Sequence, residues 1–232
     1  MTTEEYDGPE REQVEAMFDR IARRYDLLNR LLSLGRDVAW RKALVRAVPE
    51  GRPVRVLDLA TGTGDVLRAV MRARGGMGAG VDVSQGMLMY ARGKLPQAGL
   101  VRGDATRLAL ADASFGAVTI AFGIRNVSDV DAALREMHRV LAPDGRALIL
   151  EFSLPANRLF RALYLTYFRH VLPRLGAWIS GDAEAYRYLN QSVEGFPHGR
   201  AFCALMERAG FVDVRAHPLT FGIATLYEGR KA

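Results

Sequence analysis

Short, mostly apolar stretches alternate with helical patterns through the middle of the chain. The apolar stretches, which are typical of buried strands, cover residues 54–57, 79–82, 100–102, 117–122 and 146–152. Apolar residues recur at helical spacing over 66–73, over 85–94 and from 129–131 to about 141. Because parallel strands need crossover connections and are buried on both faces, this pattern predicts an α/β fold, with a parallel sheet between two layers of helices.

The two ends of the chain depart from this alternation. Residues 11–34 and 38–48 carry apolar positions at helical spacing and predict two helices ahead of the first strand. The segment 153–197 interrupts the alternation, and its residues 158–175 form an amphipathic helical pattern. Phe160, Leu163 and Tyr164 fall on the apolar side of that pattern. Residues 199–209, 212–214 and 221–227 predict a helix and two closing strands, which we expect to form a hairpin.

A glycine-rich turn follows the first predicted strand, in the sequence VRVLDLATGTGD from Val54 to Asp65. Glycines let the backbone approach a ligand closely, and the free N–H groups at the start of the next helix face the same place. A dinucleotide-binding turn would require a third glycine at the position of Leu67. The spacing Asp58-x-Ala60-x-Gly62-x-Gly64 instead resembles the first motif of S-adenosylmethionine-dependent methyltransferases. An ordinary turn that binds nothing is the alternative.

Polar residues stand where the predicted strands end. They are Asp58, Asp82, Asp104, Arg125 and Glu151. Asp82 follows Gly64 at close to the interval of about 20 residues at which α/β nucleotide-binding folds present an acid to ribose hydroxyls. Because ligands of parallel sheets bind beyond the carboxyl ends of the strands, we expect these five side chains to converge on one site.

Composition and charge narrow the class of partner. The 232 residues carry a formal net charge of +6, and arginine supplies most of the positive charge, since lysine occurs only at positions 42, 94 and 231. The arginines are spread through the chain without an aromatic and basic RNA-binding module, which argues against a nucleic-acid partner. Cys203 is the single cysteine, so the chain can form no internal disulfide, and a reducing compartment fits best.

Membrane contact is predicted only at the surface. No apolar run reaches the length of a spanning helix, and the acidic start of the chain is unlike a signal peptide, so we expect a cytoplasmic protein. Arg158, Arg161 and Arg169 cluster on the polar side of the amphipathic pattern. That helix either packs on the domain with a solvated basic face or rests on anionic lipid, at the inner face of the plasma membrane.

Several segments together resemble one family, the UbiE/COQ5 C-methyltransferases of menaquinone and ubiquinone biosynthesis. The matching text is Tyr25-Asp26…Asn29…Ser33…Trp40, Asp58 to Asp65, Phe122 to Val127, Arg139-Val140-Leu141…Pro143…Gly145…Glu151-Phe152-Ser153, and Tyr186-Arg187-Tyr188-Leu189 with Ser192. The chain departs from the family pattern at Leu28, Asp37, Ala121, Ala142 and Asp144. Asp37 and Ala121 stand where the family usually has a histidine and a serine, so any function of that histidine or serine is not expected in this chain.

The resemblance implies a class I S-adenosylmethionine-dependent methyltransferase fold. This fold is Rossmann-like, with a mostly parallel seven-stranded sheet whose last strand is antiparallel, with N-terminal helices and with a helical insert after the fifth strand. We therefore expect a single domain over 1–232. Its parts are an N-terminal helical cap (1–50), a cofactor-binding core (51–153), a helical insert for substrate or membrane (154–198), and a C-terminal helix with closing strands (199–232).

The implied reaction transfers the methyl group of S-adenosylmethionine to a ring carbon of a demethylated isoprenoid hydroquinone and leaves S-adenosylhomocysteine. Demethylmenaquinol is the simplest substrate, and a benzoquinol of the ubiquinone pathway is the alternative within the family. A soluble small molecule as substrate, a nucleic-acid methyltransferase and a scaffold without activity are the other hypotheses. No metal is expected to be needed. The oligomeric state stays open, with a homodimer as one alternative.

The resemblance also assigns site residues by position. Gly62, Thr63 and Gly64 would line the methionine moiety, Asp82 the ribose, and Asp104 with Ala105 the adenine. Asp58 and Ala60 complete the cofactor motif. The catalytic residues would be Arg125, Asn126 and Tyr25: Arg125 would stabilise a phenolate or orient a water, and Tyr25 with Asn29 would close the N-terminal helix over the substrate. In the alternative interpretation, Arg125 only pins its loop by a salt bridge. Aromatic residues of the 160–170 segment would receive the isoprenoid tail.

Overall fold

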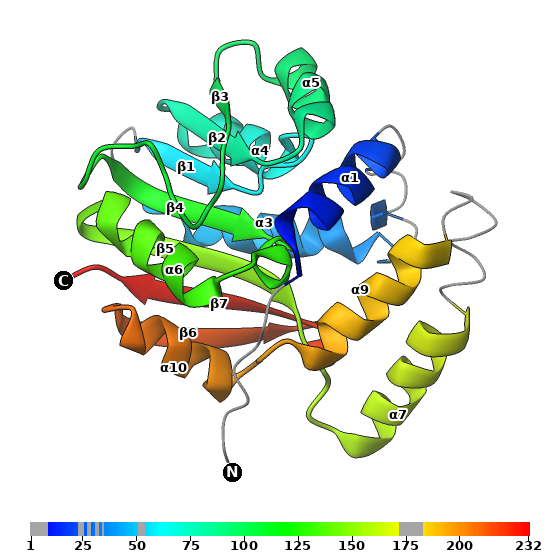
Figure 1. The fold of residues 1–232 in the computed structure, drawn as a ribbon. Helices are drawn as coiled ribbons and strands as arrows, with labels where there is room; N and C mark the ends of the chain where they lie inside the picture. Colours follow the sequence, from blue (N-terminus) through cyan, green and yellow to red (C-terminus); the bar gives the residue numbers. More distant parts are fainter. Residues whose placement is uncertain are drawn as a thin grey trace.

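The computed structural model describes residues 9–22, 26, 29–30, 33, 35–50, 54–171 and 183–232. Within them a seven-stranded sheet has the strand order β3-β2-β1-β4-β5-β7-β6 (Figure 1). Its strands are β1 (Val56–Leu59), β2 (Gly78–Asp82), β3 (Gly99–Arg102), β4 (Phe115–Ala121), β5 (Leu141–Phe152), β6 (Val212–Leu219) and β7 (Ala224–Arg230). β1 to β5 pair in parallel, and β7 is antiparallel to both β5 and β6. The predicted parallel sheet, closing hairpin and antiparallel last strand are confirmed.

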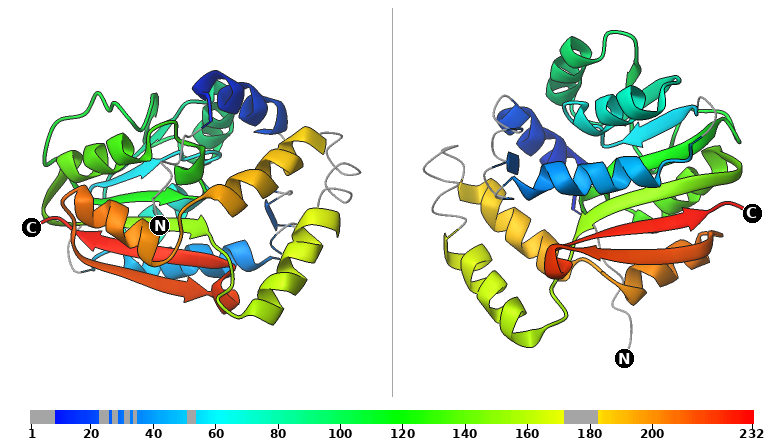
Figure 2. Two further views of the ribbon diagram at one scale, coloured as in Figure 1. Left: turned by 60° about the horizontal axis from the view of Figure 1, so that its bottom comes forward. Right: turned by 180° about the vertical axis from the view of Figure 1, so that it is seen from behind.

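Helices cover both faces of the sheet (Figure 2). The core on one face joins the strands to α3 (Arg36–Ala47) and α4 (Asp65–Arg74), and the core on the other joins them to α6 (Val130–Val140) and α10 (Arg200–Arg208). Successive residues of a strand point to opposite faces, so Val56 packs with α3 and α4, whereas Leu57 and Leu59 belong to the core beneath α6 and α10. Strands buried on both faces explain the continuous apolar runs.

Several strand boundaries lie one to three residues from the prediction, and two larger differences have a local cause. β5 begins at Leu141 because the short segment 142–145 bulges out: Leu141 pairs with Phe115, and pairing resumes between Arg146 and Ala117. Pro218, expected between two strands, lies inside β6 and is paired with Thr225. β6 is an edge strand of the described sheet, where a proline on the open side costs no ladder hydrogen bond.

The structure describes only parts of the predicted helices at the ends of the core. The pattern over 11–34 forms α1 (Arg11–Ile21), and most of the residues that follow lie outside the described part of the chain. In the insert, α7 (Arg158–Thr166) continues into a π-helical turn (Tyr167–Val171), and the rest of the predicted 158–175 helix lies outside the described residues. α9 (Ala183–Gly195) completes the insert. Among the helices described, none has an apolar stretch long enough to cross a bilayer.

Polar contacts hold α1 against the carboxyl ends of the strands. Asp19 accepts hydrogen bonds from the hydroxyl of Ser84 and from the N–H of Gly86, at the start of α5 (Gln85–Lys94). Glu15 forms an ion pair with Arg102 at the end of β3. The N-terminal helix therefore lies beside α5 at the edge of the sheet where ligands of this kind of fold bind (Figure 1).

Candidate active site

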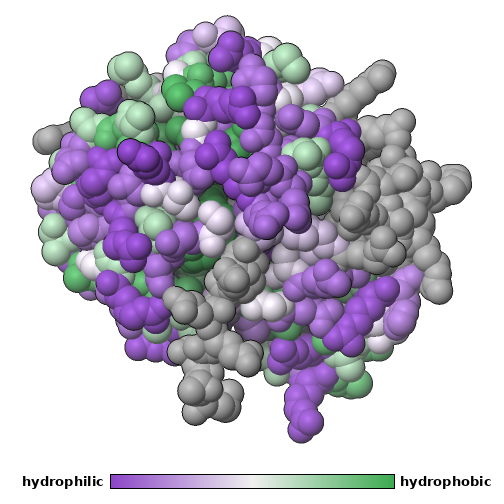
Figure 3. All heavy atoms as spheres, in the orientation of Figure 1, coloured by the Kyte–Doolittle hydropathy of each residue, from purple (hydrophilic) through white to green (hydrophobic). Residues whose placement is uncertain are grey.

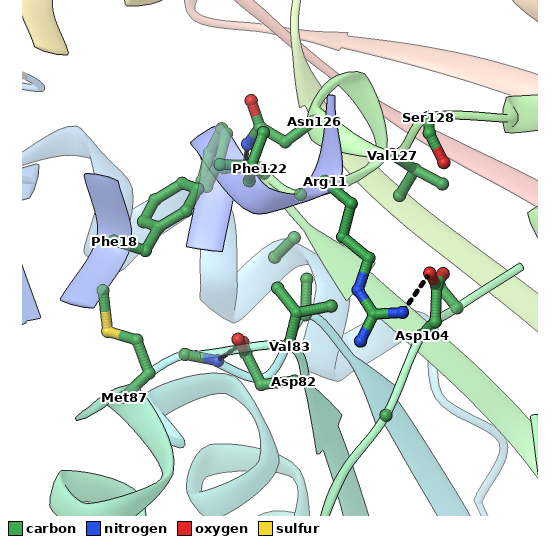
Figure 4. Close-up of a pocket in the computed structure, with 17 residues that line it drawn as sticks. Arg11, Phe18, Asp82, Val83, Met87, Asp104, Phe122, Asn126, Val127 and Ser128 are labelled. Atoms are coloured by element: carbon green, nitrogen blue, oxygen red, sulfur yellow. Dashed lines mark hydrogen bonds and ion pairs between the residues drawn. The ribbon is translucent and has the colours of Figure 1, made fainter. Parts of the chain in front are cut away.

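A cavity that is open to solvent lies at the carboxyl ends of β1, β2, β3 and β4 (Figure 4). It is lined by Arg11, Val14, Phe18, Ala60, Gly62, Asp82, Val83, Met87, Gly103, Asp104, Ala105, Ala121, Phe122, Gly123, Asn126, Val127 and Ser128. A second cavity shares Ala60, Gly62, Ala121 and Phe122 with the first, and its lining also includes Asp58, Thr63 and Asn29. The two cavities therefore meet at the glycine turn.

Asp82 ends β2 and lines the first cavity. Its carboxylate accepts hydrogen bonds from the N–H of Gly62 at 2.8 Å and from the N–H of Ser84 at 2.9 Å. Burial raises the pKa of Asp82, and these two hydrogen bonds act in the opposite direction. Two backbone donors thus fix the orientation of an acid at the position expected for a ribose ligand.

Asp104 follows β3, and Arg11 of α1 reaches it across the cavity (Figure 4). One carboxylate oxygen accepts the N–H of Thr106 at 2.9 Å and its hydroxyl at 2.8 Å. The other oxygen lies 3.4 Å from Nη1 of Arg11. Ala105, next in the chain, is buried against the core. The predicted adenine ligands therefore lie on the same cavity as Asp82, beneath the start of α1.

Asp58 lies within β1, beneath the turn, and lines the second cavity. Its carboxylate accepts the hydroxyl of Thr61 at 2.7 Å and that of Thr119 at 2.6 Å. Burial, with a smaller contribution from the nearby charge of Asp82, raises the pKa of Asp58 to about 6, although the two hydroxyls act to lower it. Asp58 therefore ties the turn to β4 and carries a carboxyl that titrates close to neutral pH.

The raised pKa of Asp58 predicts a specific pH dependence of stability. Because the folded state binds this proton more tightly than the unfolded chain, whose carboxyl has a pKa near 3.8, ionisation of Asp58 opposes folding as the pH rises. A shift of about two pH units corresponds to about 3 kcal/mol. We expect the wild-type free energy of unfolding, relative to that of Asp58→Asn, to fall by about this amount between about pH 3 and about pH 7. Urea unfolding of both proteins across this range is the measurement, and parallel curves would contradict the prediction.

The glycine turn adopts left-handed backbone conformations that explain its composition. Gly62 has φ 56° and Gly64 has φ 81°. A Cβ on Gly64 would also lie 2.7 Å from Cδ1 of Leu95, so glycine is required there on both grounds. Ala60 has φ 45°, which is uncommon for a residue with a side chain. The turn is therefore strained at Ala60, at the boundary between the two cavities.

Ala60 restricts its neighbour Gly123. A Cβ on Gly123 would lie 2.5 Å from the Cβ of Ala60, so one of the two residues has to move. We expect Gly123→Ala to destabilise the protein by about 1–3 kcal/mol and to weaken cofactor binding. Adding Ala60→Gly removes the clash and also the backbone strain, so the double variant is expected to recover most of the loss. Urea unfolding and calorimetric binding of S-adenosylhomocysteine test this, and an equal loss in single and double variants would count against it.

An ion-pair network that the sequence analysis missed surrounds the turn. The hydroxyl of Thr63 donates to Asp26 at 2.6 Å, and the ammonium of Lys94 donates to Thr63 at 2.9 Å and to Asp65 at 2.8 Å. Arg41 of α3 pairs with Asp65 from the other side, at 2.7 Å. Burial acts to raise the pKa of Asp65, but the bonds to these two cations outweigh it and lower the pKa. The network joins the N-terminal segment, α3 and α5 to the turn.

Arg125 lies in the short helical turn (Ile124–Asn126) after β4, in a buried ion pair. Its Nη1 donates to Glu151 and to the carbonyl of Phe122, both at 2.7 Å, and the guanidinium lies 5.3 Å from the ring centre of Phe152. Among the described residues, neither Arg125 nor Glu151 lines either cavity. The geometry matches the interpretation in which Arg125 pins its loop, and a direct catalytic role stays a prediction.

The other two predicted catalytic residues are placed differently. Asn126 lines the first cavity, and its side-chain oxygen accepts a hydrogen bond of 2.9 Å from the hydroxyl of Tyr188 on α9. The insert therefore contacts the site loop directly, a link that the family string containing Tyr188 did not reveal. Tyr25 lies outside the described residues.

Aromatic rings form one wall of the second cavity. Phe122 and Phe152 are 4.5 Å apart between ring centres, and Trp40 lies 5.9 Å from Phe122. The indole N–H of Trp40 donates to the hydroxyl of Thr220 at 2.8 Å. Phe122 has φ 56°, so its ring is held between the cavities by a strained backbone. A flat apolar group would fit against this wall, next to the polar cavity.

Comparison with known proteins identifies the family. The model of the ubiE/COQ5 methyltransferase family matches residues 7–231. The chain belongs to this family. It is 50% identical over 218 residues to a demethylmenaquinone methyltransferase of Thermus thermophilus, covering 92% of this chain and 99% of that one. It is 52% identical over 219 residues to a ubiquinone/menaquinone biosynthesis C-methyltransferase UbiE of Syntrophotalea carbinolica, covering 92% of each chain.

Solved structures support the fold. A crystal structure of a SAM-dependent methyltransferase from Thermotoga maritima, a possible histamine N-methyltransferase, has a TM-score of 0.68 at 20% identity over 94% of this chain and all of the other. Phosphoethanolamine N-methyltransferase 2 of Haemonchus contortus with S-adenosyl-L-methionine has a TM-score of 0.63 at 16% identity, covering 82% of this chain and 52% of that one. The predicted class I methyltransferase fold is confirmed, and as a member of the ubiE/COQ5 family the chain is an S-adenosylmethionine-dependent methyltransferase.

Proposed function

We propose that this enzyme methylates a ring carbon of demethylmenaquinol, to give menaquinol, with S-adenosylmethionine as methyl donor. One observation carries the proposal: a polar cavity with two carboxylates adjoins a cavity with an aromatic wall, and the two share Ala60 and Phe122. A nucleoside held by Asp82 and Asp104 would have its methionine end at the glycine turn, beside an apolar ring. The names of the relatives support a quinol as that ring.

The bound cofactor supplies a methyl group on a positively charged sulfur, which an electron-rich ring carbon attacks. The residues of the first cavity hold and orient the nucleoside, while Trp40, Phe122 and Phe152 position the ring and cover its apolar face. Loss of a phenolic proton to water increases the electron density at the ortho carbon. Arg125 is a permanent cation and a poor base, and its ion pair with Glu151 neutralises most of its charge, so its main effect on the reaction is to hold the loop that carries Asn126.

The same geometry accepts a benzoquinol, and the name of the Syntrophotalea relative includes ubiquinone. Mass spectrometry of quinones from cells that lack this protein separates the two substrates, because the accumulated desmethyl species identifies the ring. We expect desmethylmenaquinone to accumulate and the wild-type gene to restore menaquinone, with Asp82→Asn as the inactive control. Unchanged quinones would contradict the proposed function. Accumulation of a demethylated benzoquinone would contradict the assignment of a naphthoquinol as substrate.

The isoprenoid tail of such a substrate resides in lipid, so we also propose that the enzyme works in the cytoplasm against the inner face of the plasma membrane. No nucleic-acid partner is proposed, and a homodimer stays a prediction.

A further inference from the structure

α7 is an amphipathic helix that stands off the domain. None of its nine residues, all of which the structure describes, is fully buried. Leu159 is 74% exposed and Leu163 is 62% exposed. The other large residue beside them is Phe221, in the turn Thr220–Gly222 between β6 and β7, which is 81% exposed. The rings of Phe160 and Phe221 are 5.2 Å apart, so two segments distant in sequence form one apolar tip.

The exposed leucines lie on the face of α7 that points away from the protein. At 3.6 residues per turn, Leu159 and Leu163 are one turn apart and share a face with Ala162 and Thr166, none of them charged. The opposite face packs inward through Tyr164, whose ring stacks on that of the buried Phe168 at 5.2 Å. The apolar outer face is therefore not part of the protein core.

The backbone holds Phe221 outward. Phe221 has φ 58° and follows Thr220 at φ 46°, conformations that non-glycine residues rarely adopt. The hydroxyl of Thr220 accepts from the indole of Trp40 at 2.8 Å, and the carbonyl of Gly222 accepts from the hydroxyl of Ser153 at 2.8 Å. A strained and tethered turn that exposes a phenyl ring indicates a function for that ring.

The positive charge around α7 indicates an anionic partner. Residues 153–181 contain four arginines and no aspartate or glutamate. Arg169 is paired with Glu194 on α9, and the charge of Arg161 also acts on Glu194, whereas Arg158 is exposed and precedes Leu159 on the same helix. Purple side chains lie beside green ones over α7, at the lower right of Figure 3. Leucine and phenylalanine between arginines match the boundary between headgroups and acyl chains of an anionic bilayer.

We propose that Leu159, Leu163 and Phe221 insert into an anionic membrane, with Arg158 and Arg161 at the lipid phosphates. This surface adjoins the site, because Thr220 bonds to Trp40 of the aromatic wall. An isoprenoid tail in the bilayer then lies next to the cavity that takes its ring. This last step rests on the proposed function, whereas lipid binding itself does not.

Sedimentation with vesicles tests the surface. We expect the protein to bind vesicles of phosphatidylglycerol and phosphatidylcholine in equal parts, and the variant Leu159→Asp/Leu163→Asp to bind at least about tenfold more weakly. Met77→Asp/Met89→Asp is the matched control, since these side chains are 70% and 61% exposed elsewhere on the molecule. Arg158→Gln/Arg161→Gln is expected to lose the preference for anionic over pure phosphatidylcholine vesicles, and the exposed Arg72→Gln to keep it.

The proposal that this surface inserts into a membrane would be contradicted if the wild type and Leu159→Asp/Leu163→Asp bound vesicles equally. It would also be contradicted if the wild type failed to bind vesicles. A dimer in solution that the same variant dissociates, without vesicle binding, would assign the tip to a second copy of the chain instead. Methylation of a short-tailed quinol without vesicles separates the two proposals: we expect equal rates for the wild type and the aspartate variant. If the wild type binds vesicles but methylates no quinol, the proposed function is contradicted and the proposed membrane-binding surface is retained.

Discussion

Arg125→Gln is expected to lower kcat at least about 100-fold and to destabilise the protein by about 3–5 kcal/mol. The loss of stability follows from Glu151, which is fully buried and would lose the guanidinium partner that now lies at 2.7 Å. The loss of activity follows in either interpretation of Arg125, because the loop that carries Asn126 is held by the same pair. Steady-state kinetics with a short-tailed quinol and urea unfolding are the measurements.

The double variant Arg125→Gln/Glu151→Gln distinguishes the two roles of Arg125. It replaces both charges by amides that can still bond to each other, so most of the stability should return. If activity returns with it, Arg125 only pins the loop. If the double variant is stable and inactive, the positive charge acts on the substrate. A stable Arg125→Gln single variant would contradict the buried-pair argument itself.

Asp82→Asn is expected to weaken binding of S-adenosylhomocysteine about 100-fold or more. A carboxylate that accepts both ribose hydroxyls contributes about 1.5–3 kcal/mol per hydrogen bond, and a neutral amide keeps the volume of the side chain but not this charge. The amide oxygen can accept only one of the two N–H groups that Asp82 now binds, Gly62 or Ser84, so urea unfolding of the variant is measured beside the binding. Isothermal titration calorimetry is the measurement.

The control for Asp82→Asn is Asp131→Asn, which changes an acid of α6 that is 43% exposed and pairs with Arg208. We expect it to bind the product as the wild type does. If Asp82→Asn bound the product as tightly as the wild type, the assignment of Asp82 to the ribose would be contradicted. Asp104 would then be the remaining candidate among the acids of the first cavity.

Local patterns in the sequence were sufficient where one residue decides a boundary. The helix over 85–94 was predicted at both ends, because Ser84 is a cap whose hydroxyl accepts the N–H of Met87 at 3.0 Å. The start of β5 was predicted too late, because Pro143 and Gly145 are typical of a break and here form a bulge. Placement of Asp82 and Asp104 on one cavity followed from the rule for parallel sheets.

Contacts between distant segments were beyond sequence patterns. Lys94 meets Asp26 across 68 positions, and no periodicity relates the two. Arg125 and Glu151 were both expected at strand ends, but their neutralising each other inside the protein depends on side-chain direction. Leu163 was placed on the apolar side of its helix, and the sequence left open whether that helix packs on the domain or rests on lipid. In the structure Leu163 is 62% exposed, whereas Tyr164 and Leu165 of the same helix pack against a buried cluster.

The contact between Ala60 and Gly123 has an evolutionary consequence. Only one of the two positions can carry a methyl group, since both together would bring carbon atoms to 2.5 Å. The order of mutations at this pair therefore matters. A lineage that first loses alanine at 60 can gain alanine at 123 without a clash, whereas a lineage that gains alanine at 123 first passes through a destabilised ancestor.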